Sequence, residues 1–173
     1  MCCVWLWKIF EYRFYLGQLP KELGVWHITH LTTATYGFGP GGESRGFVLY
    51  ALPQSTADEI LELGTGWFEQ LAPFDRNLDR LEWATTPFSP EEVHWTTQKG
   101  CDLSDWWTEA GAGHVCPGIA AFVRGFGFLY DLDPDVTAFV DQSVFSEGAY
   151  VLEGRSRLIL VDPKRRYVVY AYH

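Results

Sequence analysis

The chain has 173 residues, 47% hydrophobic and 20% charged, a composition that supports a folded core and argues against an intrinsically disordered protein. Its net charge of −9 is concentrated in residues 58–147, which carry −13, whereas the segments before and after them carry +1 and +3. An acidic block repels phosphate backbones and anionic membranes, so we expect neither nucleic acid nor membrane as a partner. No stretch reaches the length of a membrane span, and the four cysteines are expected to be reduced in a cytoplasmic protein.

The first part of the chain predicts strands. Residues 8–16 alternate aromatic and polar side chains with the period of a half-buried strand, although a helix is compatible with the same residues. Residues 25–37 and 45–52 are rich in the β-branched and aromatic residues that favour strands. The glycine-rich residues 37–42 match the letters G-x-G-x-x-G of a dinucleotide-binding loop. Because a strand rather than a helix follows them, they predict a hairpin turn and no bound cofactor.

Two main helices are predicted. Residues 54–71 change to a helical period, with Ser55 or Thr56 as the expected N-cap. The face of this helix that is expected to turn inward consists of Ala57, Ile60, Leu61, Gly64, Trp67, Phe68 and Leu71. The second helix follows Asp133, which is expected to cap it ahead of Pro134.

The end of the chain predicts further strands. Residues 118–132 are expected to form a strand with a glycine bulge. Residues 149–154, 156–162 and 166–173 are separated by turn residues and predict an antiparallel meander. The elements together predict a single α+β domain over residues 1–173, with a mainly antiparallel sheet, a C-terminal three-stranded meander and two main helices packed on one face.

Candidate chemistry is found in the loop-rich middle of the chain. His94, Cys101, His114 and Cys116 offer the ligands that Zn²⁺ prefers, and Cys116 with a histidine offers a nucleophile and a base. Their spacing matches neither the tight pairs of zinc sites nor the surroundings of a catalytic cysteine. We therefore expect no metal, no cofactor and no catalytic residue. A small metal- or ligand-binding enzyme domain around these four residues is one alternative, and a structural subunit of a phage or larger assembly is another.

Acidic and aromatic side chains are the expected means of binding. Aromatic rings anchor protein interfaces, and complementary charge accelerates the encounter with a basic partner. The expected partner-binding residues are Glu59, Glu62, Glu69, Trp95, Asp102, Asp105, Trp106, Trp107 and Glu109.

Two stretches of the sequence resemble a known family in the order of their predicted elements. One is FVLYALPQSTADEILELGTGWFEQL, within residues 46–71, and the other is GAYVLEGRSRLILVDPKRRYVVYAYH, within residues 133–173. Their succession of strand, Leu-Pro, acidic helix and closing strands resembles bacterial immunity proteins, the small antitoxins encoded beside polymorphic or type VI secreted toxins. The resemblance assigns no role to an individual residue. It implies a non-enzymatic protein that neutralises a cognate toxin by tight binding, the toxin presenting a basic surface.

Overall fold

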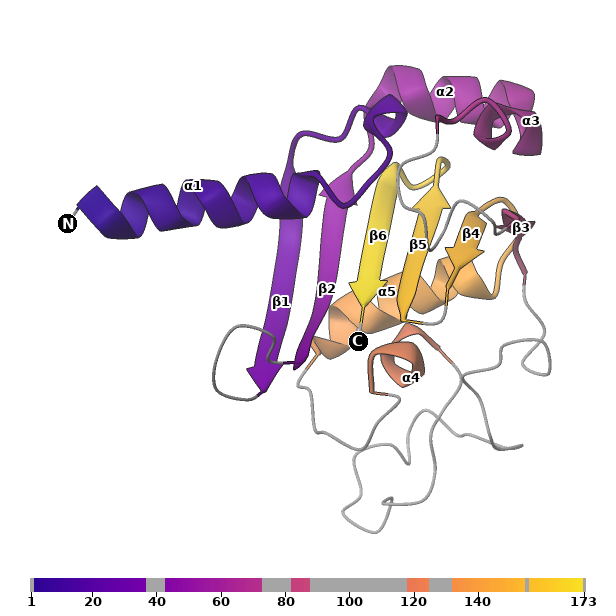
Figure 1. Ribbon diagram of the computed structural model, residues 1–173. Helices are drawn as coiled ribbons and strands as arrows, with labels where there is room; N and C mark the ends of the chain where they lie inside the picture. Colours follow the sequence, from indigo (N-terminus) through magenta and orange to yellow (C-terminus); the bar gives the residue numbers. More distant parts are fainter. Residues whose placement is uncertain are drawn as a thin grey trace, which may run out of the picture.

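The computed structural model describes six segments of the chain, and Figure 1 shows how they are arranged. The segments are residues 2–36, 43–72, 82–87, 118–124, 132–154 and 156–172. The helices are α1 (Cys2–Leu16), α2 (Gln54–Leu63), α3 (Thr65–Phe68), α4 (Ile119–Arg124) and α5 (Pro134–Val144), with the 3-10 helix η1 (Lys21–Leu23). The strands are β1 (Ile28–Tyr36), β2 (Glu43–Ala51), β3 (Ala84–Thr85), β4 (Tyr150–Glu153), β5 (Arg157–Asp162) and β6 (Tyr167–Tyr172).

The described strands form one antiparallel sheet in the order β1-β2-β6-β5-β4-β3. β1 and β2 pair as the predicted hairpin, with Tyr36 opposite Glu43. β4, β5 and β6 form the predicted meander, and β2 joins the hairpin to it by pairing with β6, where Phe47 is opposite Ala171. The α+β class, the antiparallel sheet and the C-terminal meander are confirmed.

Helices cover both faces of this sheet. On β5, Ile159 and Val161 point into one hydrophobic core, and Leu158 and Leu160 point into the other. We call the first side the front face, which is covered by the end of α1, η1, α2 and α3, and the second the back face, which is covered by α4 and α5. The expectation that the two main helices share one face is corrected, since α2 and α5 lie on opposite faces. A sheet whose strands carry apolar side chains on both faces needs other elements packed against each face.

The first segment expected as a strand, residues 8–16, belongs to helix α1. Tyr15 and Leu16 of this helix pack into the front core, whereas Phe10 and Phe14 are 68% and 53% exposed. The two phenylalanines are one helical turn apart, so the same alternation of rings in the sequence also satisfies a helix.

The expected strand over residues 118–132 is likewise wrong where the structure describes it. Residues 119–124 form α4, and Ile119, Phe122 and Val123 are buried in the back core. Positions i, i+3 and i+4 share one face of a helix, so these three side chains reach the same core only in a helical backbone.

The two main helices begin differently. At the start of α5, the Asp133 side chain accepts hydrogen bonds from the backbone N–H groups of Asp135 (2.9 Å) and Val136 (3.4 Å), as its predicted capping role requires. In contrast, α2 begins at Gln54, and its N-cap, Pro53, makes no side-chain capping bond. The prediction of a Ser55 or Thr56 cap is therefore wrong.

Candidate functional site

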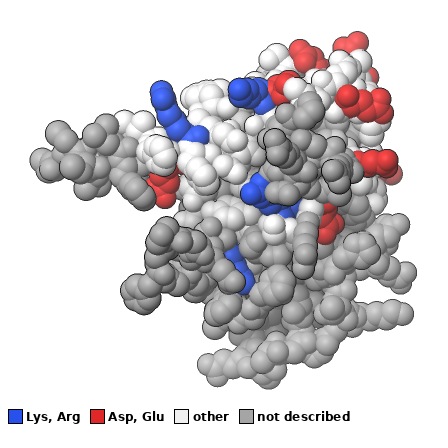
Figure 2. All heavy atoms as spheres, viewed as in Figure 1, with Lys and Arg blue, Asp and Glu red and all other residues white. Residues whose placement is uncertain are grey.

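Acidic side chains gather on the outer sides of α2 and α3, where Figure 2 shows them over these two helices. The acidic surface consists of Asp58, Glu59, Glu62 and Glu69, all of them exposed. The opposite side of α2 packs into the front core through Ala57 and Ile60, which are 1% and 0% exposed. This division of the helix directs the carboxylates away from the sheet and toward solvent.

Two leucines are exposed within the acidic surface. Leu61 and Leu63 are 49% and 51% exposed. Residues three or four positions apart are neighbours on a helix, so Leu61 lies beside Asp58 and Leu63 lies beside Glu59. The surface therefore combines apolar side chains with a surrounding of negative charge.

The exposure of Leu61 corrects the expectation that it faces the core. Gly64 has φ +60° and ψ −135°, a conformation that ends α2, and α3 begins at the next residue. The single helical face predicted for residues 54–71 therefore does not continue through the break at Gly64. Trp67 and Phe68 reach the core from α3, and Leu61 is left outside it.

Hydrogen bonds hold two of the carboxylates in place. The indole Nε1 of Trp67, a buried residue, donates to Glu59 Oε2 at 3.3 Å. Gln54 Nε2 donates to Asp58 Oδ1 at 2.8 Å, and the same Gln54 accepts a hydrogen bond of 2.7 Å from Arg166 Nη1 in the turn between β5 and β6. Part of the acidic surface is thereby fixed before any partner binds, which reduces the entropy lost on association.

The predicted site residues divide into two sets. Glu59 and Glu62 lie on α2, and Glu69 is the C-cap residue of α3, so all three belong to the acidic surface. Outside the described residues lie Trp95, Asp102, Asp105, Trp106, Trp107 and Glu109, together with His94, Cys101, His114 and Cys116. Within the described segments, no three His, Cys, Asp or Glu side chains are grouped so as to hold a metal ion.

A buried polar cluster that the sequence analysis missed joins α5 to the turn between β5 and β6. Tyr167 Oη donates to Ser143 Oγ at 2.7 Å, and Ser143 Oγ donates to the carboxylate of Asp162. Arg165 Nη1 lies 2.9 Å from Asp162 Oδ2. Ser143 and Asp162 are 0% and 1% exposed, so the hydroxyl is sealed from any substrate and serves to hold the helix to the sheet. A serine on the inward side of α5 was the available signal.

A second carboxylate on α5 holds the beginning of α4. Asp141 Oδ1 accepts a hydrogen bond of 2.7 Å from the backbone N–H of Ile119. Burial raises the pKa of Asp141 to about 6, although this hydrogen bond acts in the opposite direction. Gly118 has φ +148°, and a Cβ there would lie 2.6 Å from Asp141 Oδ2, so the close approach requires glycine.

Comparison with protein-family models, with curated proteins and with solved structures found no match. None of the described helices is both long and apolar enough to cross a membrane. The functional conclusion therefore depends on the chemistry of the acidic surface.

Proposed function

We propose that this protein is a non-enzymatic binding module that holds a basic protein partner against its acidic surface, as an immunity protein holds its toxin. The observation that carries the proposal is the pair of exposed leucines, Leu61 and Leu63, among four exposed carboxylates. Protein interfaces combine an apolar centre with a polar rim, and the charged rim selects a partner of opposite sign.

The charge distribution supports the same proposal. Residues 58–147, which include α3 and all four carboxylates of the acidic surface, carry −13 of the net charge, so their field attracts a cationic surface over several ångströms. Complete neutralisation of a toxin needs a Kd near or below about 1 nM, which corresponds to about −12 kcal/mol. Electrostatic attraction accelerates the encounter, and burial of the leucines slows dissociation.

The experiment uses the protein encoded by the neighbouring gene as the probe. We expect co-expression of the two proteins to protect cells from that gene product, and calorimetry to show a complex that weakens as salt is added. The double substitution Glu59→Lys and Glu62→Lys is expected to weaken binding at least about 100-fold.

A matched control separates a local contact from net charge. Asp135 lies in the first turn of α5, Glu147 lies three residues beyond the end of α5, and both are exposed, so Asp135→Lys with Glu147→Lys changes the net charge by the same amount at positions outside the acidic surface. This variant is expected to bind nearly as tightly as the wild type. Equal weakening by both pairs, or no complex with the neighbouring gene product, would count against the proposal.

The contribution of the leucines needs its own variant. Leu61→Ala with Leu63→Ala removes apolar area and leaves every charge in place, so the affinity is expected to fall while the salt dependence stays the same. Because both side chains are half exposed, the free energy of unfolding is expected to change by less than about 1 kcal/mol.

A further inference from the structure

The two edges of the described sheet differ greatly. One edge is β3, which has two residues, and the other is β1, which has nine. Figure 1 shows β1 along one side of the molecule, with the N-terminal part of α1 extending past it. A short edge strand offers few groups for pairing, whereas a long one presents a row of N–H and C=O groups to another chain.

β1 also lacks the residues that normally prevent such pairing. Between Glu22 and Glu43 the sequence contains no Lys, Arg, Asp or Glu, and β1 itself contains no proline. Edge strands of monomeric proteins are commonly protected by charges, prolines or bulges that twist the edge. The irregularity in β1 lies between Ile28 and His30, at its beginning, and the pairing with β2 is regular from His30 to Tyr36.

The register identifies the backbone groups that point outward. The N–H of Ala51 donates toward β1, to His27 O, and the N–H of Leu52 donates toward β6, to Arg166 O. Because these directions alternate along an antiparallel strand, the odd-numbered residues of β2 bond to β1. Their partners include Thr32 and Ala34, so the N–H and C=O groups of Leu31 and Thr33 point away from β2.

Helix α1 extends beyond this edge with apolar side chains exposed. Ile9, Phe10 and Phe14 are 53%, 68% and 53% exposed. α1 crosses the beginning of β1, where Tyr12 Oη accepts a hydrogen bond of 3.1 Å from the backbone N–H of Ile28. The helix lies at the level of the front face, because its last turn packs into the front core.

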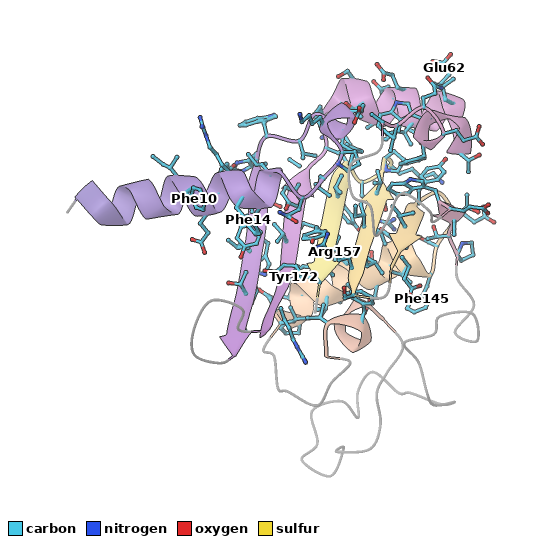
Figure 3. All side chains as sticks on the ribbon, viewed as in Figure 1. Phe10, Phe14, Glu62, Phe145, Arg157 and Tyr172 are labelled. Atoms are coloured by element: carbon cyan, nitrogen blue, oxygen red, sulfur yellow. The ribbon has the colours of Figure 1, made fainter. Side chains whose placement is uncertain are left out.

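The front face is covered unevenly. Leu31 and Thr33 lie in the middle of β1 on this face, opposite Val48 and Gly46 of β2, whereas Tyr172 of β6 is half-buried and its hydroxyl lies 3.3 Å from that of Tyr15 in α1. Leu31 is 38% exposed and Thr33 is exposed. Figure 3 shows Tyr172 and Arg157 on the strands below α1, while Phe10 and Phe14 lie on the helix.

We propose that β1 pairs antiparallel with β1 of a second copy of this chain, which joins two sheets into one of twelve strands. A two-fold axis perpendicular to the sheet, passing beside Thr32 at the middle of β1, keeps both front faces on the same side. In this register Leu31 is opposite Thr33 of the second copy, and about eight backbone hydrogen bonds form.

The same symmetry explains the position of α1. Rotation places the beginning of the second copy's β1 beside Tyr36, so its α1 extends over the front face at the end of β1, beyond the exposed Thr33. Each helix thereby covers the sheet of the other copy. A single added strand would leave Ile9 and Phe10 exposed, whereas a second complete sheet covers them. The acidic surface on α2 and α3 lies away from this interface (Figure 1).

The first test is the mass of the protein in solution. Light scattering and sedimentation equilibrium from about 1 to 100 μM are expected to give the mass of two chains. Leu31→Lys, which adds a charge to an exposed position, and Thr33→Pro, which removes an outward N–H donor, are expected to give the mass of one chain. Thr65→Lys, an exposed position at the start of α3, serves as the control and is expected to remain a dimer.

The second test examines the register. In the proposed dimer the two copies of Thr32 face each other as a non-hydrogen-bonded pair, at a Cα separation of about 4.5 Å that a disulfide spans. Thr32→Cys is expected to form a covalent dimer under mild oxidation, beyond the background of the wild type and of Thr65→Cys. A wild-type mass of one chain at all concentrations would overturn the proposal. So would a dimer that survives both Leu31→Lys and Thr33→Pro while each variant stays folded by circular dichroism.

Discussion

The substitution Asp141→Asn tests whether the carboxylate that holds α4 opposes folding at neutral pH. Burial raises the pKa of Asp141 from 3.8 to about 6, and its Oδ1 accepts the N–H of Ile119. In the unfolded chain the same carboxyl has its ordinary pKa, so between these two values the folded protein holds a proton that the unfolded chain has released. The contribution of this group to stability therefore falls as the pH rises from about 4 to 6, and it is constant above that.

The magnitude follows from the size of the shift. At about 1.4 kcal/mol per pKa unit, a rise from 3.8 to about 6 corresponds to about 3 kcal/mol. Asparagine keeps an oxygen that accepts from Ile119 and carries no charge at any pH. We therefore expect Asp141→Asn to be more stable than the wild type by up to about 3 kcal/mol at pH 7.5 and nearly equal to it at pH 4.

Urea denaturation at pH 4, 5, 6 and 7.5 gives the free energy of unfolding of both proteins, and their difference cancels the titration of all other groups. Asp135→Asn, an exposed carboxylate on the same helix, is the control, and its difference is expected to stay within about 0.5 kcal/mol across this range. A difference for Asp141→Asn that does not change with pH, or a variant less stable at pH 7.5, would refute the reasoning.

Two further predictions concern the break in α2 and the buried cluster. Gly64→Ala is expected to lower the free energy of unfolding by about 1–3 kcal/mol, because φ +60° strains an L-residue. Gly66→Ala, where a Cβ meets open space, is expected to raise it by up to about 1 kcal/mol, so thermal unfolding shifts of the same sign would contradict this assignment. Asp162→Ala is expected to cost about 2–5 kcal/mol, because Ser143 and Arg165 lose their shared acceptor, and a loss below about 0.5 kcal/mol in urea denaturation would show that the cluster does not hold α5.

The sequence predicted best where local signals agree with the tertiary structure. The meander strands are continuous apolar runs between turn residues, and burial of β5 and β6 on both faces demands that pattern. The start of α5 could also be predicted from the sequence, because Asp133, just before Pro134, caps free backbone N–H groups through a local side-chain hydrogen bond.

The sequence did not identify the element correctly where the same residues fit both the strand period and the helical period. Phe10, Tyr12 and Phe14 alternate as in a strand, yet Phe10 and Phe14 are also one turn apart in α1. Ile119, Phe122 and Val123 favour a strand by residue type, whereas their spacing suits the helix that the back core requires. In both segments the choice between helix and strand depends on which side chains the tertiary structure buries, and this cannot be read from a single sequence.

The acidic surface could be predicted only in part from the sequence. Glu59, Glu62 and Glu69 were expected to be exposed because charged residues rarely bury without a partner, and the structure confirms their exposure. Leu61 was assigned to the core because the helix was assumed to continue past Gly64. The exposure of Leu61 and Leu63 is evident only from the structure, which shows that α2 ends at Leu63 and that α3 begins at Thr65.

The pairing of β2 with β6 has a consequence for synthesis of the chain on the ribosome. The β1–β2 hairpin and the β4–β6 meander are each closed by local contacts, but Gly46 pairs with Tyr172 only after the whole chain between them has emerged. Closing so long a loop carries a larger entropic cost than forming a hairpin, so this pairing is the slow, non-local step of folding. Until β6 has emerged, β2 presents an open edge to other nascent chains, and chaperone binding to the first half of the protein would shield it.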